Sequence, residues 1–94
     1  MLIKTVSDLK DALRQGKFSS IGSYPLFFLT SDGETLSWES VRENFRECIQ
    51  AIKDGNNWEG WLIVGHDVNW EDASMFCAHS GERIESAYAE DSVN

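Results

Sequence analysis

The order of apolar and polar positions predicts a first helix over residues 8–15. Ser7 is placed to cap its start, and Gly16 to end it in the left-handed conformation. The residues expected to share its buried face recur at helical spacing: Val6, Leu9, Ala12 and Leu13.

The same spacing predicts a main helix over residues 38–53. Ser37 would cap this helix, and Gly55 follows its last residue. The apolar stripe runs without interruption along one face: Trp38, Val41, Phe45, Cys48, Ile49 and Ile52. We therefore expect one long helix, with Cys48 serving as a small hydrophobic residue in the core.

Apolar runs bounded by turn residues predict a small sheet. Residues 26–30 are such a run, and the Asp32-Gly33 turn leads to a return strand at Thr35-Leu36. The other expected strands are residues 1–4, residues 61–64 with an extension to 68, and residues 83–85. Periodicity fails at residues 69–80, where we expect irregular chain with one turn of helix near 71–76.

Together these elements predict a single domain, residues 1–94, of the α+β class. We expect a short antiparallel or mixed β-sheet packed against one long helix, followed by an irregular acidic C-terminal segment. Residues 89–94 are expected to form a frayed tail.

Charge is distributed unevenly along the chain. Residues 1–53 carry seven acids and seven bases, whereas residues 54–94 carry nine acids and a single base, Arg83, so the net charge of −8 belongs to the second part. Such a field repels nucleic acid and anionic lipid and attracts basic surfaces. Direct nucleic-acid or membrane binding is therefore not expected.

The chain has no apolar stretch that suits a signal peptide or a membrane span. Its two cysteines, Cys48 and Cys77, are too few for the disulfide framework of a small secreted protein. These features favour a cytoplasmic monomer with reduced thiols.

Metal and thiol chemistry is one alternative function. Cys77 and His79 are two potential zinc ligands, and His66, Asp67 or Cys48 could complete a set. Their spacing matches no standard zinc finger, and neither thiol lies in a nucleophile motif. We therefore expect no enzyme activity, no cofactor and no metal, with a small zinc- or thiol-dependent protein as the alternative.

The acids of the second part are the candidate partner-binding residues. A fold that presents them on one side could occupy a groove built for phosphates, and tryptophans among them could be desolvated anchors. The candidates are Asp54, Glu59, Asp67, Glu71, Asp72, Glu82 and Glu85, with Trp58 and Trp70. The other interpretation of the acids is that they keep a small protein soluble.

Three stretches resemble small acidic proteins carried by phages and mobile elements of bacteria: residues 24–33 (YPLFFLTSDG), 68–72 (VNWED) and 80–88 (SGERIESAY). Some of those proteins are similar in size and charge to anti-CRISPR and anti-restriction inhibitors. The resemblance implies a non-enzymatic inhibitor that covers the nucleic-acid-binding surface of a bacterial defence complex, in some cases as a DNA mimic. A plain interaction or accessory module, binding through an apolar patch that contains tryptophan, is a further alternative.

Overall fold

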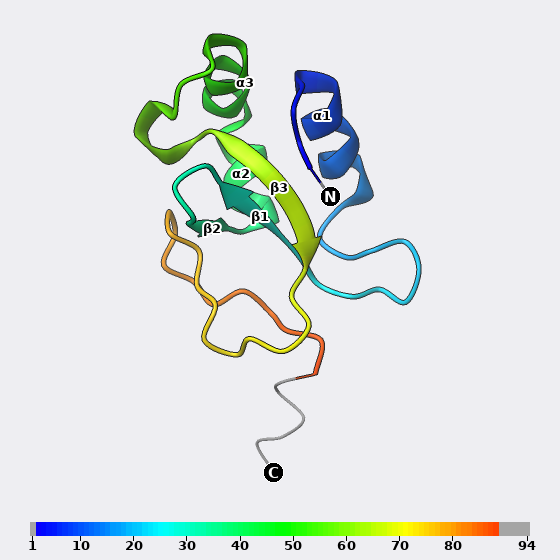
Figure 1. Cartoon of the computed structure of the whole chain (residues 1–94). Helices are drawn as coiled ribbons and strands as arrows, with labels where there is room; N and C mark the ends of the chain where they lie inside the picture. The colour runs from blue at the N-terminus through cyan, green and yellow to red at the C-terminus, as the bar shows by residue number, and fades with distance from the viewer. Residues whose placement is uncertain (1, 89–94) are drawn as a thin grey trace.

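The computed structural model describes residues 2–88 and consists of a three-stranded antiparallel sheet with helices (Figure 1). The strand order is β2-β1-β3, so the hairpin strand β1 lies in the centre. In chain order the elements are α1 (Val6–Gln15), β1 (Leu26–Thr30), β2 (Thr35–Leu36), α2 (Trp38–Glu43), α3 (Phe45–Asp54), the 3-10 helix η1 (Trp58–Gly60) and β3 (Ile63–Val68). The predicted α+β class is confirmed.

The hairpin lies where local sequence predicts it. Phe28 of β1 is opposite Leu36 of β2, and Gly33 at φ 86° forms the turn between the strands. On its other side β1 pairs with β3, with Phe28 opposite His66. Strand β3 begins two residues later than predicted and includes the expected extension to residue 68.

The prediction of one long helix is wrong. Asn44 separates α2 from α3 with φ −114° and ψ 34°, outside the helical range. Its side-chain amide donates to the carbonyl oxygen of Ser40 at 2.9 Å, and its backbone N–H bonds the same oxygen at 3.1 Å. The predicted ends are correct, because Ser37 accepts from the Ser40 N–H and Gly55 adopts the left-handed conformation.

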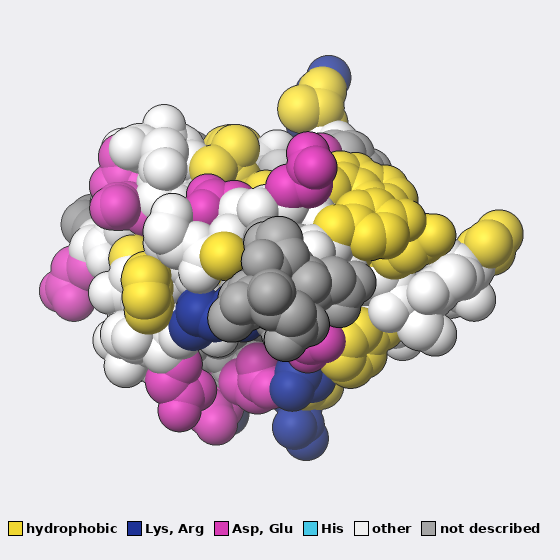
Figure 2. Space-filling model, turned by 90° about the horizontal axis from the view of Figure 1, so that it is seen from below, with side chains coloured by type: hydrophobic (Ala, Val, Ile, Leu, Met, Phe, Trp, Pro, Cys, Tyr) yellow, Lys and Arg dark blue, Asp and Glu magenta, His cyan; other side chains and the backbone are white. Residues whose placement is uncertain are grey.

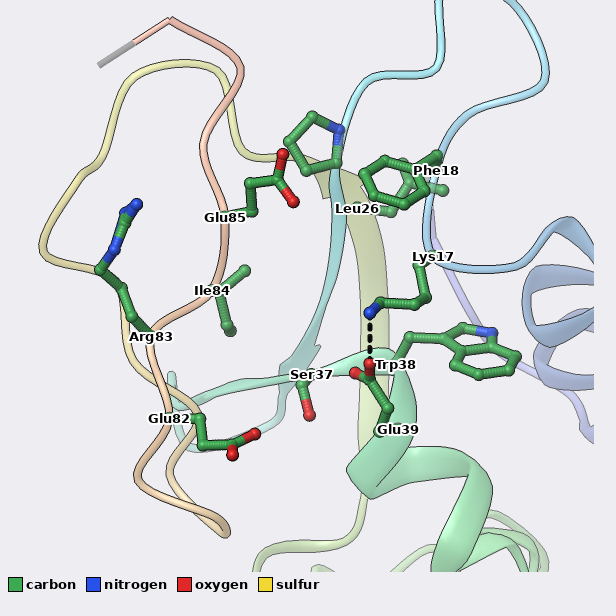
Figure 3. A pocket seen from close by; sticks show the side chains of 11 residues that line it. Lys17, Phe18, Leu26, Ser37, Trp38, Glu39, Glu82, Arg83, Ile84 and Glu85 are labelled. Carbon is green, nitrogen blue, oxygen red and sulfur yellow. Dashed lines mark ion pairs between the residues drawn. The ribbon is translucent and has the colours of Figure 1, made fainter. Parts of the chain in front are cut away.

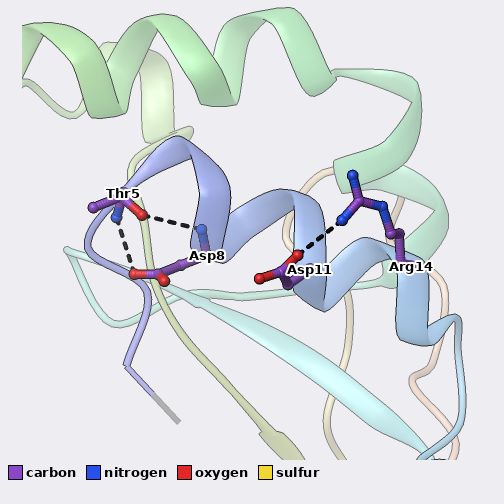
Figure 4. Close-up of polar contacts among 4 residues, drawn as sticks. All are labelled: Thr5, Asp8, Asp11 and Arg14. Atoms are coloured by element: carbon purple, nitrogen blue, oxygen red, sulfur yellow. Dashed lines mark hydrogen bonds and ion pairs between the residues drawn. The ribbon is translucent and has the colours of Figure 1, made fainter.

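The first helix begins earlier than predicted, and Thr5 rather than Ser7 is its N-cap (Figure 4). The Thr5 hydroxyl accepts from the Asp8 N–H at 3.1 Å, and the Asp8 carboxylate accepts from the Thr5 N–H at 3.2 Å. The Lys4 N–H donates to the same carboxylate, and these bonds lower the pKa of Asp8. Gly16 ends the helix at φ 85° and ψ −163°, which is not the left-handed helical conformation that we predicted.

Residues 69–88 contain neither the helical turn expected near 71–76 nor the strand expected at 83–85. They are irregular, with one isolated bridge between Phe76 and Arg83. The buried Asn69 organises them, since its side-chain amide donates to the carbonyl oxygens of Asp72 and Glu85, both at 3.1 Å. The strand expected at residues 1–4 is reduced to one bridge between Leu2 and Gly65 among the described residues. The tail expected at 89–94 lies outside them.

The core joins both sheet and helices to the irregular segment. Phe28, Leu9, Ile63 and Val41 are its largest fully buried apolar side chains, and Cys48 is buried among them, as predicted from the helical stripe. Cys77 and Ile84 bring residues 69–88 into the same cluster: their packing keeps this segment at one end of the molecule, away from α1 and α3 (Figure 1). Within residues 2–88, none of the helices has the length and apolar character needed to cross a membrane.

Candidate functional site

Three aromatic rings from distant parts of the sequence meet at the surface. We call Tyr24, Trp70 and Tyr88 the aromatic cluster. The ring centroids of Tyr24 and Trp70 are 4.6 Å apart, and the Trp70 and Tyr88 rings stack at 5.9 Å with an interplanar angle of 12°. Trp70 is 43% exposed and Tyr88 50% exposed, so the cluster presents large rings to solvent. Exposed aromatic groups of this kind are frequent anchors in protein interfaces.

Backbone contacts fix the aromatic cluster in place. The Tyr88 N–H donates to the carbonyl oxygen of Trp70 at 2.8 Å, which aligns residues 87–88 with residues 69–70. Tyr24 is held by its N–H, which donates to the Ser19 hydroxyl at 2.9 Å. Gly22 adopts φ 85°, and a Cβ there would lie 2.5 Å from the Tyr24 ring. The loop before β1 therefore requires glycine for Tyr24 to reach Trp70.

Carboxylates lie in the same segments as the aromatic cluster. Glu71 follows Trp70, and Glu85 lies in the stretch whose backbone is bonded to Asn69. Asp72 accepts hydrogen bonds from the side chain and the backbone N–H of Ser74, which lower the pKa of its carboxyl. Figure 2 shows this end of the molecule: a hydrophobic area has acidic side chains near its upper and lower edges, further acidic side chains lie on the opposite side of the view, and some Lys or Arg side chains are also visible. The end formed by residues 69–88 is thus both apolar and acidic.

A second group of charges surrounds a cavity of about 170 Å³ between α2 and residues 82–85 (Figure 3). Lys17 forms an ion pair there with Glu39 at 2.5 Å. The opposite wall carries Glu82 and Glu85, whose side chains point toward Lys17 and Glu39 in Figure 3. Two of the predicted acids therefore lie near a third acid, Glu39. Glu39 belongs to residues 1–53, whose charges sum to zero.

A third group of charged residues lines a hollow of about 430 Å³ beside the turn between β1 and β2. Glu59 of η1 lines it together with Asp32 and Glu34 from the β1–β2 turn. Glu59 has φ 49°, an uncommon value for a residue other than glycine. The ring of His79 packs against Trp61 at 4.9 Å beside these acids.

The remaining predicted acids are placed separately. Asp67 is exposed on β3 opposite Phe27, and Asp54 is the last residue of α3, where it accepts from the Gln50 side chain. Trp58 begins η1, and its side chain lies outside the described part of the structure. The predicted residues therefore fall into several groups. Two of these groups also contain acids from the first part of the chain: Glu39 in one, and Asp32 and Glu34 in the other.

The candidate metal ligands have different neighbours. Cys48 is in the core, where burial raises the pKa of its thiol to about 12. His66 is buried and stacks on Phe28 at 4.8 Å, and burial lowers its pKa. Among residues 2–88, no group of three or more histidines, cysteines or acids is arranged to hold a metal ion.

Cys77 has an environment that sequence spacing does not reveal. Its sulfur lies 3.2 Å from the Ser40 hydroxyl and accepts from the Ser37 N–H at 3.3 Å. Burial alone would raise the pKa of this thiol, but hydrogen bonds from Ser40, Ser80 and Ser37 together lower it to about 6. The sulfur joins α2 to the irregular segment, because the thiol donates to the Ser40 hydroxyl and accepts from the Ser37 N–H.

No protein family model, curated protein or solved structure matches this chain.

The geometry of residues 69–88 is suited to binding a positively charged surface. Exposed rings supply apolar contact area that becomes buried on association, while carboxylates around them attract and orient basic side chains. Aromatic faces also attract lysine and arginine directly.

Proposed function

We propose that this protein is a non-enzymatic inhibitor that binds the basic, nucleic-acid-binding surface of another protein and blocks its access to DNA. The observation that carries the proposal is the combination of the aromatic cluster with acidic residues at one end of the molecule. Among residues 69–88 there are four acids and one base, Arg83. The partner class is a bacterial CRISPR or restriction complex. We propose it because the sequence of this chain resembles those of phage-borne inhibitors.

Charge and apolar contact have separate roles in this proposal. Carboxylates accelerate encounter with a basic groove and fix the orientation of the complex, and this contribution weakens as salt screens it. The rings of Trp70 and Tyr88 contribute the desolvated contacts that slow dissociation. A plain interaction module would use the same rings without depending on charge, so the two functions differ in their response to salt.

The test is capture of partners from a bacterial lysate on the tagged full-length protein at low and high salt. We expect a nucleic-acid-binding complex that is released by raised salt and displaced by duplex DNA. The purified complex should then lose DNA binding in a gel-shift assay as the protein is added. Capture that is indifferent to salt and to DNA would contradict the proposal and favour the plain interaction module.

Matched variants locate the contact. Glu71→Lys reverses one charge beside the aromatic cluster and should weaken capture, whereas Glu47→Lys makes the same change on α3, at the other end of the molecule in Figure 1, and should have little effect. Trp70→Ala should also weaken capture, but without changing its salt dependence. Equal effects of the two lysine variants would show that only net charge matters and would contradict a defined site.

A further inference from the structure

The cavity between α2 and residues 82–85 has features that the proposed function does not use. Its volume of about 170 Å³ is far above the roughly 10–15 Å³ that admits one water, and below the roughly 300–1,000 Å³ of pockets for drug-sized ligands. The space therefore suits a single side chain better than a cofactor.

The walls of the cavity combine apolar and acidic groups. Phe18, Leu26 and Ile84 supply apolar surface along its length. Glu39 lies on one side, and Glu82 and Glu85 lie on the other (Figure 3). Arg83 also lines the rim, but its side chain points away from Lys17 in Figure 3. A long aliphatic stem that ends in a cation matches this pattern.

The protein already places one ammonium group among these carboxylates. Lys17 pairs with Glu39, and the hydrogen bond and charge of Glu39, followed by the charges of Glu85 and Glu82, raise the pKa of Lys17. The Lys17 side chain is 51% exposed, so it is not locked into this position. Among residues 2–88, Glu82 and Glu85 form no ion pair with a base. The cavity thus attracts a cation and retains two carboxylates to pair with one.

We infer that this cavity is a binding pocket for one lysine or arginine side chain of the partner, with Lys17 as an internal competitor. The inference rests on the proposed function, because it names how a basic surface is recognised. The incoming stem packs against Phe18 and Ile84, and its cationic head pairs with Glu82 and Glu85. One guanidinium of the chain already lies beside a residue of this cavity, because Arg42 lies over the ring of Trp38 at 5.3 Å.

The probes are Nα-acetyl-lysine methylamide and its arginine analogue, titrated into the ¹⁵N-labelled full-length protein. We expect NMR shifts at the amides of Glu82 and Glu85 and at the indole of Trp38. The norleucine analogue, which has the stem without the charge, is the control and should cause no such shifts. Equal shifts with the norleucine analogue, or none with the basic probes, would overturn the inference.

Variants give the sharper result. Lys17→Met keeps a flexible stem of similar length but removes the competing charge, so it should bind the basic probes roughly threefold to tenfold more tightly. Glu82→Gln and Glu85→Gln should each weaken binding, while Glu71→Gln, an acid in the same segment outside the cavity, should not. Weaker binding by Lys17→Met, or equal effects of all three glutamine variants, would contradict a pocket with these roles.

Failure of the pocket can be distinguished from failure of the function. If Glu82→Gln and Lys17→Met leave salt-sensitive capture of the partner unchanged while Glu71→Lys abolishes it, the function stands and the pocket is refuted. If the probes bind as expected but no DNA-displaceable partner is captured, the pocket stands and the proposed function fails.

Discussion

Cys77 shows at the scale of one residue how hydrogen bonds can override burial. Its side chain is 1% exposed, which by itself disfavours the thiolate. Hydrogen bonds from Ser40, Ser80 and Ser37 nevertheless hold its pKa at about 6, below the ordinary value of 9.0. The thiolate is thus favoured in the folded protein at pH values where the unfolded chain carries the thiol.

This shift predicts a pH dependence of stability. Because the folded pKa is depressed, the stabilisation is fully present above pH 9 and is lost as the pH falls through 6. The free energy of unfolding should therefore rise between about pH 7 and pH 9, by at most roughly 1.4 kcal/mol per pH unit. Urea unfolding of the wild type across this range measures the slope.

Cys77→Ala is the control for this slope. The variant should be less stable throughout, because it leaves a small cavity, but its free energy of unfolding should be nearly flat over the same pH range. If the slope persists in Cys77→Ala, another group titrates over this range. If the wild type shows no slope, the thiol of Cys77 stays protonated, and the prediction is wrong.

At the scale of elements, the predictable parts are those with local causes. The hairpin follows from an apolar run and the Asp32-Gly33 turn, and the ends of α2 and α3 follow from Ser37 and Gly55. The break at Asn44 was missed because the apolar stripe continues across it. Hydrophobic periodicity reports which face is buried, not that the side-chain amide of residue 44 shares the Ser40 carbonyl oxygen with its own backbone N–H.

The irregular course of residues 69–80 was expected from the sequence, but the contacts that order this segment could not be predicted, because several of them are distant. The Ala78 N–H donates to the Thr35 carbonyl oxygen at 2.9 Å, and the Thr35 hydroxyl donates to the Phe76 carbonyl oxygen at 2.8 Å. Asn69 links both ends of the segment through its side chain. The contacts with Thr35 join residues about 40 positions apart, far outside the sequence window that a periodicity argument examines.

The start of α1 gives a prediction at this scale, since sequence and structure name different caps. Thr5→Ala removes the hydroxyl that accepts from Asp8, and should lower the free energy of unfolding by about 1 kcal/mol. Ser7→Ala, the matched control, lies inside the helix and should change it by less than about 0.5 kcal/mol. Thermal or urea unfolding measures both; a larger loss for Ser7→Ala would restore Ser7 as the cap.

In the whole molecule, the way charge is distributed along the sequence does not predict how the charged side chains are grouped in the fold. Glu59 shares its hollow with Asp32 and Glu34, and Glu82 and Glu85 share theirs with Glu39. Trp70, one of the predicted residues, is exposed and belongs to the aromatic cluster, and several predicted acids line the two hollows. The sequence did not predict how those acids are grouped. Grouping depends on which loops the fold brings together, and no local signal carries that information.

The net charge of −8 also predicts how the fold responds to salt. The two ion pairs found between described residues, Arg14–Asp11 and Lys17–Glu39, are both about half-exposed or more, so screening them costs little. Repulsion among the excess acids destabilises the compact state and is screened by the same salt. Sodium chloride should therefore raise the melting temperature measured by circular dichroism at pH 7.

The size of the rise can be bounded and its cause isolated. A gain of about 1 kcal/mol corresponds to roughly 4–8 °C in a domain of this length. The double variant Glu43→Gln, Glu47→Gln removes two exposed charges, one on α2 and one on α3. It should melt higher at low salt, and its melting temperature should change less when salt is added. A melting temperature that falls with salt would mean that attraction outweighs repulsion in the fold, and the acids would then contribute to its stability.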